Sequence, residues 1–195
     1  MATISWGKPK IFIGAAGSVP LDTASTSGTY AFSLLSTPVE DSTNLTGTQG
    51  DKTEATIEGG EAEATKYNAA TFELTMKVRM ALDTVGVNEV YRHLAPALYE
   101  ATTGNDAYKE YTKSNVAVVL IPDEEKAPGF FCPACSVSIM ETYTAADGAM
   151  WEITLAPNVT ANDKAVNFGQ FYAIKKTSND KDTYQIVKGT RPTTA

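Results

Sequence analysis

Residues 71–80, TFELTMKVRM, alternate without a break between apolar and polar side chains. A period of two residues is that of a β-strand, in which successive side chains point to opposite faces of a sheet. One face of this segment must therefore lie on a core, and the other must meet water or a polar partner. The apolar positions are Phe72, Leu74, Met76, Val78 and Met80, and the polar positions are Thr71, Glu73, Thr75, Lys77 and Arg79.

Strand signals continue along the chain, separated by turns rich in Gly, Pro, Asn and Asp. Residues 52–67 read as two strands joined at Gly59-Gly60, and residues 29–35 as a strand or a docking segment. The other expected strands are 10–13, 115–121, 130–143, 150–157, 165–176 and 183–189. Because strands do not alternate with helices, the chain predicts a mainly β fold, a β-sandwich or barrel, in a single domain over residues 1–195.

One helix is expected, over residues 88–104. Asn88 suits its N-cap, and apolar residues recur along it at helical spacing. Pro96 should kink or split it, and Gly104 suits its C-terminal end. The predicted fold is therefore a β-sandwich or barrel with one flanking α-helix and long loops.

Residues 36–50 are expected to form a long loop, because they are rich in Ser, Thr and Gly and exceed the usual connection of about 4–6 residues. Long loops often reach for a partner. Seven acidic residues and one basic residue, Lys52, lie between Glu40 and Glu63. The loop and the start of the hairpin after it are therefore strongly acidic.

The hairpin over residues 52–67 should have two unlike faces. Its acidic face consists of Glu54, Thr56 and Glu58 on the first strand and of Glu61, Glu63 and Thr65 on the second. The other face carries Ile57 and alanines. Two interpretations stay open: a solvated hairpin whose charges discourage aggregation, or a wall whose negative face meets a cavity or a neighbouring subunit.

The charge balance limits the kinds of partner. A net charge of −7 and a pI near 4.8 argue against a surface that grips nucleic acid, because phosphate binding needs clustered Lys and Arg. The first ten residues contain no apolar stretch of signal-peptide length, and no segment has the length and apolarity of a membrane span. We therefore expect synthesis in the cytoplasm and no membrane association.

The stretch 129–137, GFFCPACSV, holds the only two cysteines, at redox or zinc-knuckle spacing. A redox centre places its first Cys at a helix N-terminus, and a zinc site needs four ligands. Here the flanking residues alternate as in a strand, which places Cys135 on the same face as Val137 and Ile139. We therefore predict a strand with a buried Cys135 rather than a reactive centre.

Other signals of catalysis are weak. His93 lacks a sequence-defined nucleophile beside it, and residues 13–20, IGAAGSVP, lack the third Gly and the helix of a phosphate-binding turn. We expect no catalytic activity, no cofactor and no metal. An enzyme that uses the two thiols stays open as a third interpretation, behind the two non-enzymatic ones given below.

The order of elements resembles a known family. A Trp6-Gly7-Lys8-Pro9 opening, the loop TPVEDSTNLTGTQGDK, the acidic hairpin EATIEGGEAEA, one helix and a return to β-strands together resemble the tail tube proteins (major tail proteins) of tailed bacteriophages, in particular those of phages and prophages of Bacteroides-like hosts. The resemblance implies a structural virion protein. Rings of six copies would stack into a hollow tail tube, and DNA would pass through it without specific binding.

The resemblance also implies partners and site residues. The partners would be further copies of the chain and the tail tape-measure, tail-terminator and baseplate proteins, in a virion assembled in the host cytoplasm. The acids expected at the lumen or its rim are Glu54, Glu58, Glu61 and Glu63. The residues expected in the inter-ring or inter-subunit loop are Thr37, Glu40, Asp41, Asn44, Leu45 and Gln49. A head-decoration, tail-terminator or baseplate-associated protein, or a cell-surface binding module, is the alternative, and contractile and non-contractile tails fit equally.

Overall fold

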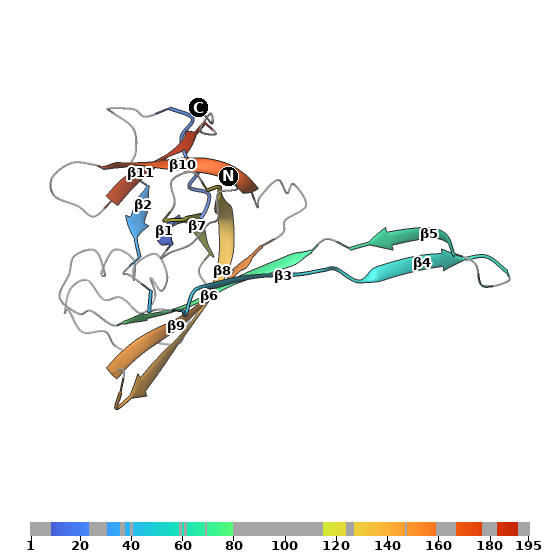
Figure 1. Ribbon diagram of the computed structural model, residues 1–195, viewed down its shortest axis with the longest axis horizontal. Helices are drawn as coiled ribbons and strands as arrows, with labels where there is room; N and C mark the ends of the chain where they lie inside the picture. The colour runs from blue at the N-terminus through green and yellow to red at the C-terminus, as the bar shows by residue number, and fades with distance from the viewer. Residues whose placement is uncertain are drawn as a thin grey trace, which may run out of the picture.

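The computed structural model describes residues 9–23, 31–35, 38–39, 41–58, 60, 62–68, 70–79, 115–123, 127–146, 148–158, 167–176 and 183–190. Within these ranges it holds eleven strands and no helix (Figure 1). The strands are β1 (Lys10–Ala15), β2 (Phe32–Leu34), β3 (Asn44–Thr48), β4 (Lys52–Thr56), β5 (Ala62–Tyr67), β6 (Thr71–Arg79), β7 (Asn115–Ile121), β8 (Gly129–Thr144), β9 (Gly148–Pro157), β10 (Asn167–Lys176) and β11 (Thr183–Gly189). The prediction of a mainly β protein is confirmed, whereas the helix expected over residues 88–104 lies outside the described residues.

Six strands form a closed circuit. The sheet order runs β10-β11-β2-β1-β7-β8, and β10 pairs again with the start of β8. The closure is tight at Gly129, where an added Cβ would lie 2.5 Å from the backbone oxygen of Leu120 and 2.9 Å from the ring of Tyr172. Side chains from all six strands fill the inside of this small barrel, with Phe12, Phe32 and Ile186 at its centre.

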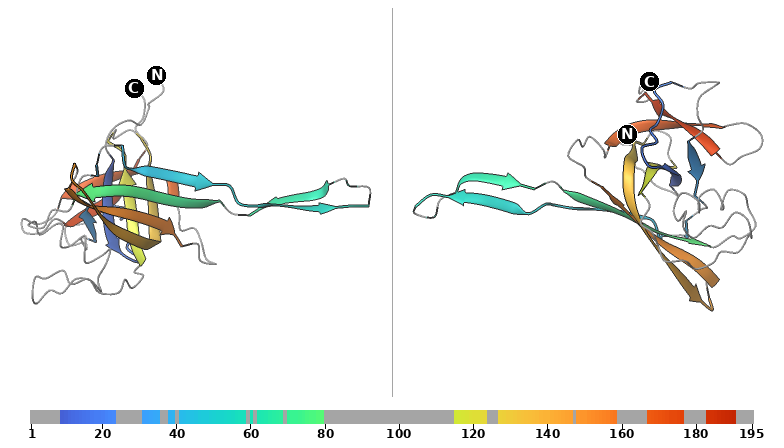
Figure 2. Two further views of the ribbon diagram at one scale, coloured as in Figure 1. Left: turned by 90° about the horizontal axis from the view of Figure 1, so that it is seen from below. Right: turned by 180° about the vertical axis from the view of Figure 1, so that it is seen from behind.

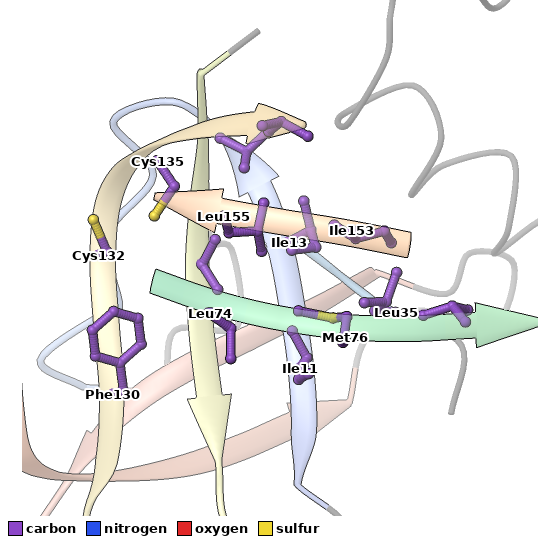
Figure 3. Packing of buried hydrophobic residues seen from close by; sticks show 14 of the residues in the cluster. Ile11, Ile13, Leu35, Leu74, Met76, Phe130, Cys132, Cys135, Ile153 and Leu155 are labelled. Atoms are coloured by element: carbon purple, nitrogen blue, oxygen red, sulfur yellow. The ribbon is translucent and has the colours of Figure 1, made fainter. Parts of the chain in front are cut away.

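A second layer is a four-stranded sheet. Past residue 136, β8 leaves the barrel and pairs only with β9 among the described strands. In the sheet, β9 is followed by β6 and then by β3. The main core lies between this sheet and the outer face of β1 and β7 (Figure 3). Leu74, Met76 and Val78 of β6 are all buried there, so the alternation read from the sequence is confirmed over residues 71–79.

Strands β4 and β5 form an arm that projects from this body (Figures 1 and 2). Thr48 of β3 pairs with Thr71 of β6, and Lys52 of β4 pairs with Tyr67 of β5. Three residues separate the two pairings on either side, 49–51 and 68–70, so the register of the pairing is unchanged. The arm therefore continues the edge ribbon of the sheet. At about 3.3 Å per residue, residues 49–58 extend about 33 Å beyond β3.

The expectation of a loop over residues 36–50 is wrong for Asn44–Thr48, which form β3. This segment is polar because the side chains on its solvent-facing side meet water, and its one apolar side chain, Leu45, packs on the main core. A five-residue strand with a single half-buried apolar residue gives almost no periodic signal, so its sequence resembles that of a loop.

Candidate functional site

The two cysteines lie in a β-bulge of β8. Val116 of β7 pairs with Cys135, and Val118 pairs with Cys132. Between these two pairs β8 therefore contains one residue more than β7. The carbonyl of Pro133 accepts a hydrogen bond from the Gly17 amide at 2.9 Å, which holds the bulge against the loop after β1. Both thiols face the main core (Figure 3).

The environment of the thiols is unlike that of a reactive centre. Cys132 and Cys135 are 0% and 1% exposed, which confirms the predicted burial of Cys135. The pKa of the Cys135 thiol is raised far above its usual range. The larger cause is a hydrogen bond with the Cys132 side chain, and the smaller one is burial. A thiol becomes nucleophilic through a lowered pKa and access to solvent. For Cys135 both conditions are reversed, and Cys132 is equally buried.

The arm carries the described part of the predicted acidic face. Glu54 and Glu58 are exposed, and Glu54 forms an ion pair with Lys52 on the same face of β4. Glu61 lies outside the described residues, and Glu63 is placed only as part of β5. The hairpin itself is confirmed.

A bulge near the arm's tip breaks the alternation from which the acidic face was predicted. Ala55 pairs with Ala64, but Thr56 pairs with Ala62, a shift of one residue. Because such a shift exchanges the two faces of a strand, sequence spacing no longer assigns residues near the tip to a common face.

The predicted loop residues have different surroundings. Thr37 and Glu40 lie outside the described residues, and Asp41 is exposed in a turn with φ +56°. Asn44 and Leu45 belong to β3, and Gln49 is exposed where the arm begins. The structure therefore places the four described members of this group along one sheet edge and at the base of the arm.

Within the described part of the chain, the four-stranded sheet has two edges that pair with no further strand, which the sequence patterns did not show. On one side, β3 pairs with β6 alone among the described strands. On the other, the distal half of β8, residues 137–144, pairs only with β9 among the described strands. Native sheets usually protect such edges with Lys, Pro or a covering segment. The sequence of β3, NLTGT, contains no charge and no proline.

Large apolar side chains are exposed on the same elements. Tyr67 of β5 is 54% exposed, and Met140 and Tyr143 of the distal β8 are 57% and 77% exposed. Ile57, beyond the end of β4, is 46% exposed. Both the arm and an open edge thus present apolar groups to solvent.

No helix in the described part of the chain has the length and apolarity needed to cross a membrane. Among the same residues, no group of three or more His, Cys, Asp or Glu side chains is arranged to hold a metal ion. Comparison with protein-family models and with curated protein sequences gave no match.

Proposed function

We propose that this chain is a structural protein of a bacteriophage tail tube, which joins further copies of itself into rings that stack into a hollow, DNA-conducting tube. The observation that carries the proposal is that one four-stranded sheet has two edges at which no other described strand pairs. An unprotected edge strand is a template for pairing with another chain. Two such edges on one sheet suit a head-to-tail assembly, in which each copy is both donor and acceptor.

The strand directions support closure into a ring. All pairings within the sheet are antiparallel, and the order is β3, β6, β9 and distal β8. With four alternating strands per copy, β3 and β8 run in opposite directions. When β3 of one copy meets β8 of the next, the new pair is also antiparallel, so the alternation continues around the ring without a fault.

The arm supplies a second contact. A two-stranded hairpin alone is marginally stable in water, and β4 and β5 pair only with each other among the described strands. With its reach of about 33 Å, the arm extends to a neighbouring copy or ring, and its exposed Tyr67 and Ile57 contact that neighbour. Glu54 and Glu58 then lie at the rim of the tube or at the contact between copies.

The remaining elements of the proposal follow from the resemblance. The partners are the tape-measure, tail-terminator and baseplate proteins, and the site of action is the virion tail. The net charge of −7 suits a conduit, because a protein of the same sign as DNA offers few sites where phosphate would bind.

Cysteine cross-linking tests the edge pairing directly. Thr46→Cys on β3 is combined in turn with Ser138→Cys, Met140→Cys and Thr142→Cys on β8, and each double variant is oxidised at a concentration where rings form. The native thiols are 0–1% exposed, so they should not compete. One combination should give a ladder of linked copies that ends at the ring number, while electron microscopy shows rings or tubes.

The matched control is Thr46→Cys with Thr154→Cys, which places the second thiol on the central strand β9. It should give no linked copies. A discrete oligomer without a central hole, with none of the edge pairs linked, would overturn the proposal and favour a decoration or surface-binding protein.

A further inference from the structure

The bulge in β8 brings the two cysteines to the same face of the strand. In a regular strand, residues three apart point to opposite faces. Val116 and Val118 of β7 are only two apart, and they pair with Cys135 and Cys132. The extra residue in β8 therefore turns both thiols to one side, where they join the main core together with the two valines (Figure 3).

The bulge also shortens the distance between the two cysteines. Three residues of a regular strand span about 10 Å, whereas two residues span about 6.6 Å. Because the cysteines lie opposite Val116 and Val118, their Cα atoms are separated by about the shorter distance. Disulfides join Cα atoms that are about 4.4–6.8 Å apart. The backbone of the bulge therefore suits a bond between the Sγ atoms of Cys132 and Cys135.

The two side chains are already in contact. A hydrogen bond joins the thiols of Cys132 and Cys135. The Cys132 thiol also donates to the carbonyl oxygen of Ala134 at 3.2 Å, and the same carbonyl accepts a hydrogen bond from the Asn158 amide at 2.8 Å. A contact from the segment after β9 thus holds the backbone between the cysteines, so the thiols stay adjacent.

The surroundings of the pair allow a disulfide and limit when it can form. Both cysteines are 0–1% exposed, and a disulfide is as uncharged as two thiols, so its formation places no charge in the core. The attacking species in disulfide exchange is a thiolate. Because the pKa of the Cys135 thiol is raised, exchange should be slow while the core is closed. The bond would therefore form as the chain folds or when it opens locally.

We propose that Cys132 and Cys135 form a structural disulfide across the bulge in an oxidising environment, and that this bond fixes the bend between the barrel and the four-stranded sheet. The oxidant is a small-molecule disulfide such as oxidised glutathione. One cysteine thiolate attacks it, forms a mixed disulfide and releases one glutathione thiolate; the other cysteine then displaces the second glutathione. The protein loses two electrons and two protons, and two glutathione thiols are formed. The inference does not depend on the proposed tube.

A redox titration of the folded and the unfolded chain tests the inference. Reduced and oxidised chains are each refolded in buffers of known ratios of reduced to oxidised glutathione, so that equilibrium is approached from both sides. Free thiols are trapped at low pH with N-ethylmaleimide in denaturant and counted by mass spectrometry. The equilibrium constant for formation of the bond should be at least ten-fold larger in native buffer than in concentrated urea. A constant that is equal or smaller in native buffer would overturn the inference.

The matched control exchanges the residues at positions 134 and 135, as Ala134→Cys with Cys135→Ala, and so keeps the composition and both thiols. Residue 134 is half-buried and points away from the face of Cys135. Folding should then give no gain in the equilibrium constant. A gain as large as that of the unmodified chain would refute the role of the bulge. The oxidised unmodified chain should also unfold at a higher urea concentration than the reduced chain, a measurement that needs no variant, and a lower midpoint would contradict the inference.

Discussion

Removing the arm should separate folding from assembly. Because Thr48 and Thr71 are paired, the 22 residues 49–70 can be replaced by Asn-Gly, the two-residue turn that best suits such a pair. The arm's described residues from Asp51 to Glu58 are all exposed, and β4 and β5 pair only with each other in the described part of the chain. The replacement therefore removes no part of either core.

The expected change in unfolding free energy follows from these observations. Loss of exposed residues costs little, within about 0.5 kcal/mol. Shortening the connection from 22 residues to two lowers the loop-closure cost in folding by about 2 kcal/mol at most, at about 0.6 kcal/mol per doubling of length. We therefore expect the arm-free chain to be as stable as the full chain or up to about 2 kcal/mol more stable.

Urea unfolding followed by tryptophan fluorescence measures this change, because Trp151 is buried in the main core. The reference variant is Leu155→Ala, which empties a fully buried position and should lose about 2–5 kcal/mol. Electron microscopy of the same samples should show that the arm-free chain no longer stacks. A loss above about 2 kcal/mol would show that the arm supports the body, and normal tubes from the arm-free chain would refute its role as a connector.

Three further outcomes are expected. Gly129→Ala should lower the unfolding free energy by about 1–3 kcal/mol, because the added Cβ would overlap the backbone oxygen of Leu120. Urea unfolding measures the loss, and an unchanged midpoint would contradict the tight closure of the barrel. Burial raises the pKa of Tyr172 from 10.0 to about 12. The contribution of neutral Tyr172 to the unfolding free energy is therefore full below pH 10 and is lost as the pH rises to 12. In Tyr172→Phe, the unfolding free energy measured in urea should fall less steeply over that pH window. Cys132 and Cys135 should react with iodoacetamide only on unfolding, and rapid labelling of the native chain, followed by mass spectrometry, would contradict their burial.

Much of the fold was predictable from short-range patterns. The alternation over residues 71–79 gave the buried face of β6 correctly, and the residues around Cys135 gave a strand in place of a helix. Both segments have a core on one side, so burial leaves a period-two record in the sequence. β3 was missed because only Leu45 touches the core.

The candidate site was less predictable because its defining features are relations between distant segments. No local pattern states that β3 and the distal half of β8 end the same sheet, since that follows from their pairings with β6 and β9. Likewise, the hairpin signal over residues 52–67 was correct, but it does not show whether a hairpin packs on a body or projects from it. The bulge near its tip also shifted the register on which the acidic face was predicted.

The bulge in β8 links these features and explains why small buried thiols lie there. β8 belongs first to the barrel and then to the four-stranded sheet, and the extra residue between Cys132 and Cys135 lies where it changes from one to the other. A bulge bends its strand and increases its twist, so this residue sets the angle between barrel and sheet. In the proposed ring, that angle sets how the edge of one copy approaches the edge of the next. The inside of the bend is buried and close-packed, and cysteine suits it because its side chain is small and apolar. The thiols of the CPAC stretch thus pack the main core at this bend.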